Sequence, residues 1–203
     1  LAILNGGLVP FNALGLPAPI LRGVRAAGYS TPTPIQQKAI PAVLEGRDII
    51  GAAQTGSGKT AAFVLPILAK LLTGYDALRA LILVPTRELA AQVETNARDY
   101  ARFTRLRVGV VYGGVPIPPQ ERMLRNEGVN LLVATPGRLL DLQGRQSVSL
   151  DDVEMLVLDE AERMVDMGFP PDLQRILRLL PKQRQTLLFS ATMPPALNKV
   201  AND

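Results

Sequence analysis

Short apolar runs alternate along the chain with longer stretches in which apolar residues recur at helical spacing. Runs that are apolar without interruption are typical of parallel strands covered on both faces. Each run is followed by a stretch long enough for a crossover helix. The pattern therefore predicts an α/β fold, a doubly wound and mainly parallel sheet with helices on both faces, in three layers. We expect its strands at residues 49–50, 80–84, 107–112, 130–134, 154–158 and 185–189.

Two helices are expected near the start of the chain. Apolar residues recur at helical spacing over residues 17–27, and Gly28 is placed to end that helix. A loop with two prolines follows and stiffens the chain before a second helix over residues 35–45. Residues 1–10 show no clear period, so we expect a lead-in segment that is flexible or not native to the protein. No repeat or linker divides residues 11–203, which we expect to form one domain.

The composition excludes several kinds of chemistry. With 203 residues, of which 47% are hydrophobic and 20% charged, the chain is expected to fold rather than to remain disordered. It contains no cysteine and no histidine, which excludes disulfides and thiolate or imidazole sites. Carboxylates, lysine or tyrosine must then supply any acid–base group. The net charge of +4 is compatible with an anionic partner, although a soluble surface is the commoner reason for so small an excess.

Neither a signal peptide nor a membrane span is expected. The first basic residue is Arg22, so the start of the chain lacks the charged segment of a signal peptide. No run of about 18 apolar residues occurs. We therefore expect a cytoplasmic protein. Because the chain begins with Leu1 and stops at Asp203 just after a helix-like start, we also expect it to be a fragment of a longer protein.

A glycine-rich stretch after the first predicted strand has the properties of a phosphate-binding loop. Residues 53–60 read AQTGSGKT, and the glycines let the backbone approach a ligand closely at the start of a helix. Lys59 supplies a charge for terminal phosphates, and the Thr60 hydroxyl is a ligand for Mg²⁺. The alternative is an ordinary turn before a helix that happens to contain a lysine. The nucleotide-binding residues expected here are Thr55, Gly56, Ser57, Gly58, Lys59 and Thr60.

Acidic residues follow a predicted strand at the same edge of the sheet. Asp159, Glu160 and Glu162 come directly after the apolar residues 156–158. Ligands of open α/β sheets bind at the carboxyl ends of the strands, so these acids are expected beside the phosphate loop. Asp159 is the expected partner of the metal ion, and Glu160 is the candidate base for a hydrolytic water. Acids at a helix start also favour the helix dipole, which is the alternative explanation.

Three further strand ends contain small polar residues, glycines and arginines. Hydroxyls, exposed backbone N–H groups and guanidinium groups suit a sugar–phosphate backbone, whereas few groups that could recognise bases are present. Each stretch alone could be a turn before a helix. Together at one sheet edge they favour a shared track for phosphates. The residues are Pro85, Thr86, Arg87, Gly113, Gly114, Thr135, Pro136, Gly137 and Arg138.

The proline-rich loop after the first helix could hold a planar base. Tyr29 offers an aromatic ring, and Gln36 offers an amide that both donates and accepts hydrogen bonds. This pair suits adenine, although a helix-capping turn is the better explanation unless a nucleotide lies nearby.

Residues 11–192 resemble the first of the two RecA-like domains of DEAD-box RNA helicases. Six motifs occur in the family's order, which is far more specific than any one of them. Phe11 with residues 28–36 resembles the adenine-recognising Q motif. The others are residues 53–60 (motif I), 85–89 (motif Ia), the GG element at 113–114, residues 135–138 (motif Ib) and 190–192 (motif III).

The resemblance implies a role for each motif. ATP and Mg²⁺ would be the cofactors, with Tyr29 stacked on adenine, Gln36 bonded to its edge and Phe11 supporting the pocket. Lys59, Thr60, Asp159 and Glu160 would form the ATP-hydrolysing site. The residues of the phosphate track would bind RNA by its backbone. Ser190 and Thr192 would couple ATP hydrolysis to local duplex unwinding.

Two departures from the family pattern lead to further expectations. Residues 159–162 correspond to the family's motif II but read DEAE, with Glu162 where the family has aspartate. We expect altered coupling to motif III and unaffected magnesium binding. The chain also contains no second RecA-like domain, which in the family supplies an arginine finger. We therefore expect a monomeric fragment that binds nucleotide with modest affinity and hydrolyses ATP barely, if at all.

Other functions remain open on the residues alone. A phosphate-loop kinase or GTPase would share residues 53–60, but residues 135–138 and 190–192 would have no role in it. A phosphate-loop NTPase that acts on DNA is another alternative, because nothing in the sequence visibly recognises a 2′-hydroxyl. The domain could also be an RNA- or protein-binding module that uses nucleotide only as a structural ligand.

Overall fold

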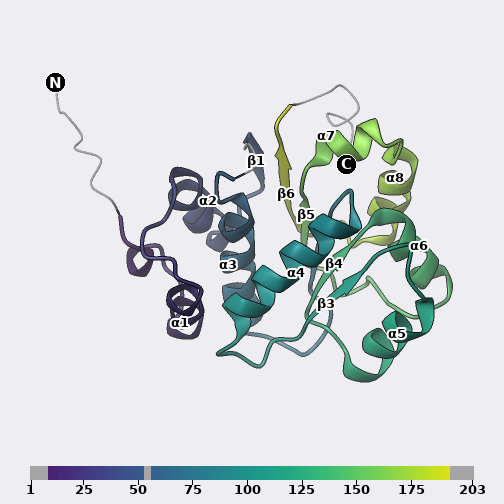
Figure 1. The fold of residues 1–203 in the computed structure, drawn as a ribbon, viewed down its shortest axis with the longest axis horizontal. Coiled ribbons are helices and arrows are strands. Elements are labelled where there is room, and N and C mark those ends of the chain that lie inside the picture. Colours follow the sequence, from purple (N-terminus) through teal and green to yellow (C-terminus); the bar gives the residue numbers. More distant parts are fainter. Residues whose placement is uncertain (1–8, 53–55, 193–203) are drawn as a thin grey trace.

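The fold is built on one six-stranded parallel sheet. The structure is a computed structural model and describes residues 9–52 and 56–192 (Figure 1). The strand order is β1-β6-β5-β2-β4-β3, and every neighbouring pair is parallel. The strands are β1 (Ile49–Ala52), β2 (Ala80–Leu83), β3 (Val108–Val111), β4 (Leu131–Ala134), β5 (Met155–Leu158) and β6 (Gln185–Ser190).

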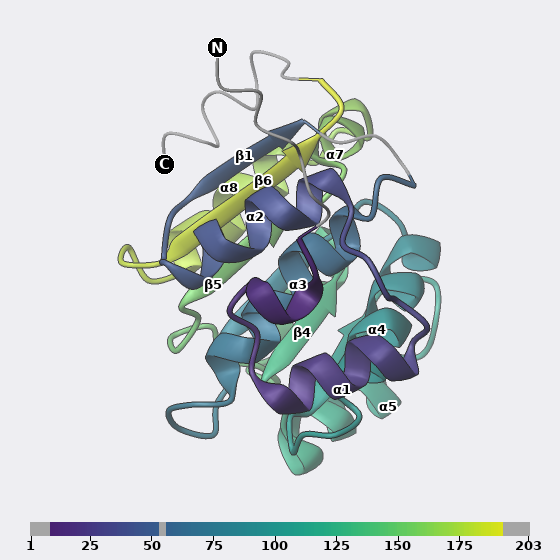
Figure 2. The ribbon, with the colours of Figure 1, turned by 90° about the vertical axis from the view of Figure 1, so that its left-hand side faces the viewer.

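Helices cover both faces of this sheet. Helices α1 to α4 lie on one face, and Figure 2 shows them in front of the strands. Helices α5 to α8 and the π-helical segment η2 lie on the other face. The helical elements are η1 (Phe11–Ala13), α1 (Ala18–Ala26), α2 (Pro34–Leu44), α3 (Lys59–Leu71), α4 (Arg87–Ala101), α5 (Ile117–Arg122), η2 (Met123–Glu127), α6 (Pro136–Gly144), α7 (Ala161–Asp166) and α8 (Pro170–Leu179).

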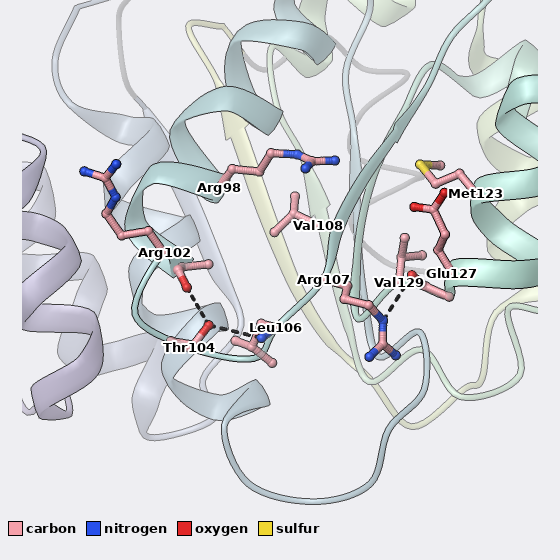
Figure 3. A pocket seen from close by; sticks show the side chains of 11 residues that line it. Arg98, Arg102, Thr104, Leu106, Arg107, Val108, Met123, Glu127 and Val129 are labelled. Atoms are coloured by element: carbon pink, nitrogen blue, oxygen red, sulfur yellow. Dashed lines mark hydrogen bonds between the residues drawn. The ribbon is translucent and has the colours of Figure 1, made fainter.

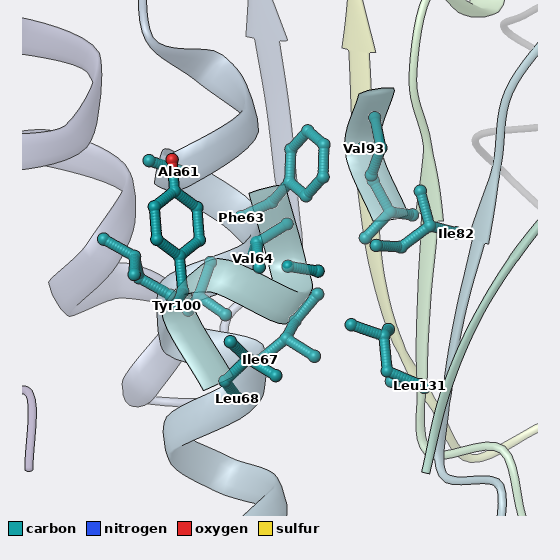
Figure 4. Packing of buried hydrophobic residues seen from close by; sticks show 14 of the residues in the cluster. Ala61, Phe63, Val64, Ile67, Leu68, Ile82, Val93, Tyr100 and Leu131 are labelled. Atoms are coloured by element: carbon teal, nitrogen blue, oxygen red, sulfur yellow. The ribbon is translucent and has the colours of Figure 1, made fainter. Parts of the chain in front are cut away.

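The strands are apolar on both faces because the sheet separates two hydrophobic cores. Successive strand residues point to opposite faces, so Ala80 and Ile82 enter the first core while Leu81 and Leu83 enter the second. Figure 4 shows part of the first core, to which Phe63 and Ile67 of α3, Tyr100 of α4, and Ile82 and Leu131 of the sheet all belong. Burial on both faces explains why the sequence runs are apolar without alternation.

The predicted fold class is confirmed. Every expected strand is present, and both expected helices begin and end within one residue of the prediction. Gly28 ends α1 as expected: its φ is +84°, and the Tyr29 N–H bonds back to the carbonyl of Val24. Within residues 9–52 and 56–192 no helix is long and apolar enough to cross a membrane. Most of the expected lead-in segment lies outside the described residues.

The topology gathers the loops of interest at one edge. All six strands are parallel, so the segments after β1, β2, β3, β4 and β5 emerge on the same side of the sheet. The helices that connect β1 to β2 and β2 to β3 cover one face of the sheet. The helices that connect β3 to β4, β4 to β5 and β5 to β6 cover the other face, so the direction of the chain across the sheet reverses. A doubly wound sheet binds its ligands at the carboxyl edge where this direction reverses. The fold thereby places the start of α3 beside the acids that follow β5.

Candidate functional site

A buried ion-pair cluster joins the start of α3 to the end of β5. The Lys59 Nζ lies 3.0 Å from Asp159 Oδ1 and 3.8 Å from Glu160 Oε1. Lys59, Asp159 and Glu160 are 7%, 0% and 7% exposed. Burial raises the pKa of the Asp159 carboxyl above its ordinary value, and the neighbouring Lys59 charge offsets part of the rise. The structure thus brings together three of the four residues predicted to hydrolyse ATP; Thr60, the fourth, lies in the first turn of α3.

Two buried polar atoms at this cluster have no hydrogen-bond partner among the described residues. They are Asp159 Oδ2 and the hydroxyl Oγ of Ser57. Buried polar atoms in folded proteins are almost always paired, so these two atoms are available to a bound group or a water. A carboxylate oxygen suits Mg²⁺ or a water bound to it, and a hydroxyl beside a helix start suits a phosphate oxygen. The donor set therefore fits a magnesium–phosphate group.

The phosphate loop is held by the residue predicted to recognise adenine. The Gln36 side chain accepts a hydrogen bond from the Thr33 N–H at 2.9 Å and donates one to the Gly58 carbonyl at 3.0 Å. Gly58 has φ +84°, and a Cβ there would lie 2.6 Å from Gln36 Nε2. Gln36 therefore completes the capping box of α2 and fixes the start of α3. Thr55 lies outside the described residues.

The aromatic residues of the predicted adenine pocket line one cavity of about 450 Å³. Phe11 is buried, whereas Tyr29 is 42% exposed and meets the Tyr100 ring edge-on, with centroids 5.9 Å apart. Gln36 is not among the residues that line this cavity. The structure thus brings Phe11 and Tyr29 together and shows the Gln36 amide in contact with the phosphate loop, while its bond to adenine stays a prediction.

Glu162 contacts the segment that resembles motif III. The Ser190 hydroxyl donates to Glu162 Oε2 at 2.7 Å and also approaches the Thr192 carbonyl oxygen. Ser190 is the last residue of β6, and Glu162 lies in the first turn of α7. The longer carboxylate side chain of DEAE therefore reaches the residues that an aspartate was expected to contact.

Sequence reasoning missed a partner of Glu160. Arg163 Nη1 donates to Glu160 Oε2 at 2.6 Å. Glu160 has φ +51°, a left-handed conformation that is uncommon outside glycine, and it precedes the short helix α7. The i, i+3 spacing of the two side chains was the available signal.

The three remaining strand ends form a single cleft of about 530 Å³. Thr86 caps α4 through a hydrogen bond from the Leu89 N–H, and Arg138 Nη2 donates to the Val115 carbonyl at 3.0 Å. Arg87 pairs with Glu88 at 2.7 Å. Of the predicted track, Pro85, Thr86, Arg87, Gly113, Thr135, Gly137 and Arg138 line the cleft, whereas Gly114 and Pro136 do not.

The cleft also contains residues that sequence reasoning missed. Asp141, Met167 and Phe169 line it from α6 and from the segment after α7. Asp141 stands one helical turn after Arg138, and Met167 is 49% exposed although it is apolar. An apolar pair around Gly168, directly after the acidic segment, was the signal in the sequence.

Comparison with known proteins decides the family. Residues 33–200 match the DEAD/DEAH box helicase family. The chain belongs to this family. It is 47% identical over 190 residues to the DEAD-box ATP-dependent RNA helicase CshA of Streptococcus pneumoniae, which covers 94% of this chain and 36% of that protein. It is 46% identical to the DEAD-box ATP-dependent RNA helicase 52A of Oryza sativa, over 95% of this chain and 35% of that protein.

A solved helicase structure agrees with the fold. The crystal structure of a hypothetical ATP-dependent RNA helicase from Sulfolobus tokodaii superposes with a TM-score of 0.84 and 40% identity. The match covers 91% of this DEAD-box chain and 54% of that chain. The predicted RecA-like architecture is confirmed. The chain spans about a third of the length of the curated relatives it matches.

Proposed function

We propose that this chain is the ATP-binding RecA-like domain of an ATP-dependent RNA helicase that couples Mg-ATP hydrolysis to local duplex unwinding. The observation that supports this most directly is the buried cluster of Lys59, Asp159 and Glu160 at the carboxyl edge of the sheet. In a member of the DEAD/DEAH box family, this cluster is where phosphates and a metal ion are expected.

The residues at the cluster have distinct proposed roles. Lys59 would exchange its contact with Asp159 for the terminal phosphates, and the N–H groups of residues 56–60 would surround them. Thr60 and Asp159 would hold Mg²⁺, which when bound neutralises charge on the phosphate oxygens. Glu160 would orient the attacking water and accept its proton at a carboxylate oxygen.

The proposed adenine and RNA sites correspond to two cavities that contain residues predicted for them. Phe11 and Tyr29 would enclose the base, with Gln36 acting through the phosphate loop. RNA would lie along the cleft formed by the strand ends, where Thr86, Thr135, Arg87 and Arg138 contact its backbone. A single domain of this kind is expected to be monomeric, with the rest of the RNA contact supplied by a second RecA-like domain of the longer protein.

Calorimetric titration of this chain with AMP, ADP, ATP and GTP, with and without Mg²⁺, tests the proposal. We expect adenine nucleotides to bind, ATP to bind more tightly with Mg²⁺, and GTP to bind at least about tenfold more weakly. Equal affinity for GTP would contradict the adenine site.

A substitution separates an enzyme domain from a simple binding module. Lys59→Ala should abolish measurable ATP affinity and leave the Arg87 and Arg138 cleft unchanged, so binding of a uridine oligonucleotide in the absence of ATP should persist. Any ATP-dependent increase in RNA affinity should disappear in the same variant. If ATP never alters RNA affinity in the unsubstituted chain, nucleotide is only a structural ligand.

A further inference from the structure

A third cavity lies at the other end of α4 from the proposed RNA cleft. Its volume is about 300 Å³, and it is lined by the last turn of α4, the segment that leads into β3, and η2 with the two residues after it (Figure 3). Arg87 at the start of α4 lines the proposed RNA cleft, whereas Arg102 after its end lines this cavity. Fifteen residues of helix separate them by about 22 Å. We name this cavity the arginine cleft.

The rim of the arginine cleft is positively charged. Arg98, Arg102 and Arg107 line it together with one carboxylate, that of Glu127. Arg98 pairs with Glu94 through Nε, so its terminal nitrogens stay available. Arg102 forms no ion pair with any residue of the described ranges. Arg102 is thus the one lining guanidinium with no ion pair among the described residues, because Arg107 pairs with Asp76.

Arg107 is held in place rather than left mobile. Its Nε donates to the Gly128 carbonyl at 3.3 Å, and Nη2 pairs with Asp76 at 2.6 Å. Asp76 reduces the local excess of positive charge. Because Asp76 is not among the residues that line the cleft, it does not block the opening. A fixed guanidinium group loses less conformational entropy when it binds a carboxylate.

The floor of the arginine cleft is aliphatic. Leu106, Val108, Met123 and Val129 line it below the charged rim (Figure 3). Gly109 allows this packing, because a Cβ there would lie 2.6 Å from Val129 Cγ1 and 3.1 Å from Met123 Cε. Methionine adapts readily to different apolar partners. The floor therefore suits one apolar side chain of a ligand.

The cleft opens beside an unpaired sheet edge. Strand β3 is the last in the sheet, and β4 is the only described strand that pairs with it. A strand with one free side has backbone N–H and C=O groups that can pair with an extended peptide, although three of the four β3 residues are buried. Val108, the first residue of β3, lies in the floor, so a peptide in the cleft would reach this edge.

We propose that the arginine cleft binds an acidic peptide segment of a partner protein. The segment would place one apolar side chain on the floor and its carboxylates against Arg98, Arg102 and Arg107. Single-stranded RNA fits less well, because it needs aromatic rings for stacking and none of the eleven lining residues is aromatic. Phe103, an exposed ring next to Arg102 in the sequence, already has the guanidinium of Arg22 at 4.3 Å from its centroid. The partner would thus dock without competing for the ATP or RNA sites.

Titration of the ¹⁵N-labelled chain with short peptides tests the proposal. The probes are peptides in which Asp and Glu flank a central Leu, Met, Phe or Trp, and matched peptides with Asn and Gln in place of the acids. We expect the acidic peptides to shift the amide signals of residues 104–111 and 123–129 and to leave Gly56 and Gly58 unchanged. Affinity should fall as salt is raised.

A charge-reversal variant supplies the control for position. Arg98→Glu combined with Arg102→Glu should weaken acidic-peptide binding by at least about tenfold. Arg178→Glu, at an exposed position of α8 that does not line the cleft, should change it less than about twofold. Both variants alter exposed residues, and their thermal unfolding is measured to show that they remain folded.

Three results would overturn the proposal. The first is that none of the acidic peptides shifts these signals at millimolar concentration. The second is that the neutral peptides bind equally well or that the double variant keeps full affinity. The third is that a uridine hexanucleotide produces the same shifts with higher affinity, which would make the cleft an RNA surface.

Discussion

At the scale of single residues, Glu162 is the side chain whose length matters most. Its carboxylate accepts the Ser190 hydroxyl at 2.7 Å, and this contact joins the acidic segment after β5 to the end of β6. Aspartate at this position would withdraw the carboxylate by about 1.5 Å, one carbon–carbon bond. A hydrogen bond to a charged group contributes about 1.5–3 kcal/mol when it is buried.

We therefore expect Glu162→Asp to leave ATP affinity of this chain within about twofold, because Lys59 and Asp159 are untouched. In the longer protein, RNA-stimulated ATP turnover should fall about tenfold, since the hydrogen bond to Ser190 is lost. Steady-state turnover at saturating RNA measures the effect. Ser190→Ala should reproduce it, and the double variant should add little. Equal turnover in the parent and in Glu162→Asp would show that the contact does not couple the sites.

At the scale of elements, α1 and α4 touch through their backbones. Gly23 of α1 faces the carbonyl of Tyr100, and a Cβ at Gly23 would lie 2.1 Å from that oxygen. Neither partner is the end of a flexible side chain, so the two helices must separate to admit a methyl group. Helix α1 leads directly to Gly28 and Tyr29, so its displacement also moves one side of the proposed adenine pocket.

Gly23→Ala should consequently lower the free energy of unfolding by about 1–3 kcal/mol or more, the usual cost of overpacking. For a chain of this size the loss corresponds to about 2–12 °C in Tm. The affinity of the Gly23→Ala variant for ATP should fall, and its preference for ATP over GTP should become smaller. Gly144→Ala is the matched control, because nothing lies within 4 Å of a Cβ there. A Gly23→Ala variant as stable as the control would mean that α1 is not held against α4 as described.

Strands were predictable from the sequence where the burial of their apolar residues is enough to define them. Strands β2, β4 and β5 stand out because both of their faces are covered and all their residues are apolar and buried. Contacts between elements were harder to predict, because local sequence patterns do not determine the order of the strands in the sheet. Gln36 illustrates this: its amide was assigned to a ligand, yet it also holds Gly58, 22 residues away. The roles assigned to the site residues remain predictions.

The residues of the proposed RNA cleft also divide into those that were predictable from the sequence and those that were not. Arg87 and Arg138 were predictable because parallel strands end at one edge of a sheet. Met167 and Phe169 were not, because the segment after α7 reaches the cleft only through the packing of α7 and α8 on the far face. Local sequence thus identifies the strand ends, whereas tertiary packing decides what else joins them.

At the scale of the whole molecule, the site has few positive charges for a phosphoryl-transfer reaction. Among the described residues, Lys59 and Arg163 are the only basic side chains within ion-pair distance of Asp159 or Glu160. Arg163 is already bound to Glu160 Oε2. Enzymes of this class use a further arginine to stabilise the transition state, supplied from the same chain or from another. The 203 residues should therefore bind ATP without hydrolysing it efficiently.

We expect the ATPase rate of this chain to lie about 10³ to 10⁵ below that of the longer protein with RNA, the factor that a missing arginine produces. Phosphate release measured with saturating ATP, Mg²⁺ and RNA gives the comparison. Glu160→Gln serves as the background control, because it removes the proposed base while keeping a side chain of similar size. A parent rate indistinguishable from this control agrees with the expectation. Robust RNA-stimulated turnover by these residues would show instead that the site holds all the charge it needs, with Arg163 released from Glu160 as the first candidate to supply it.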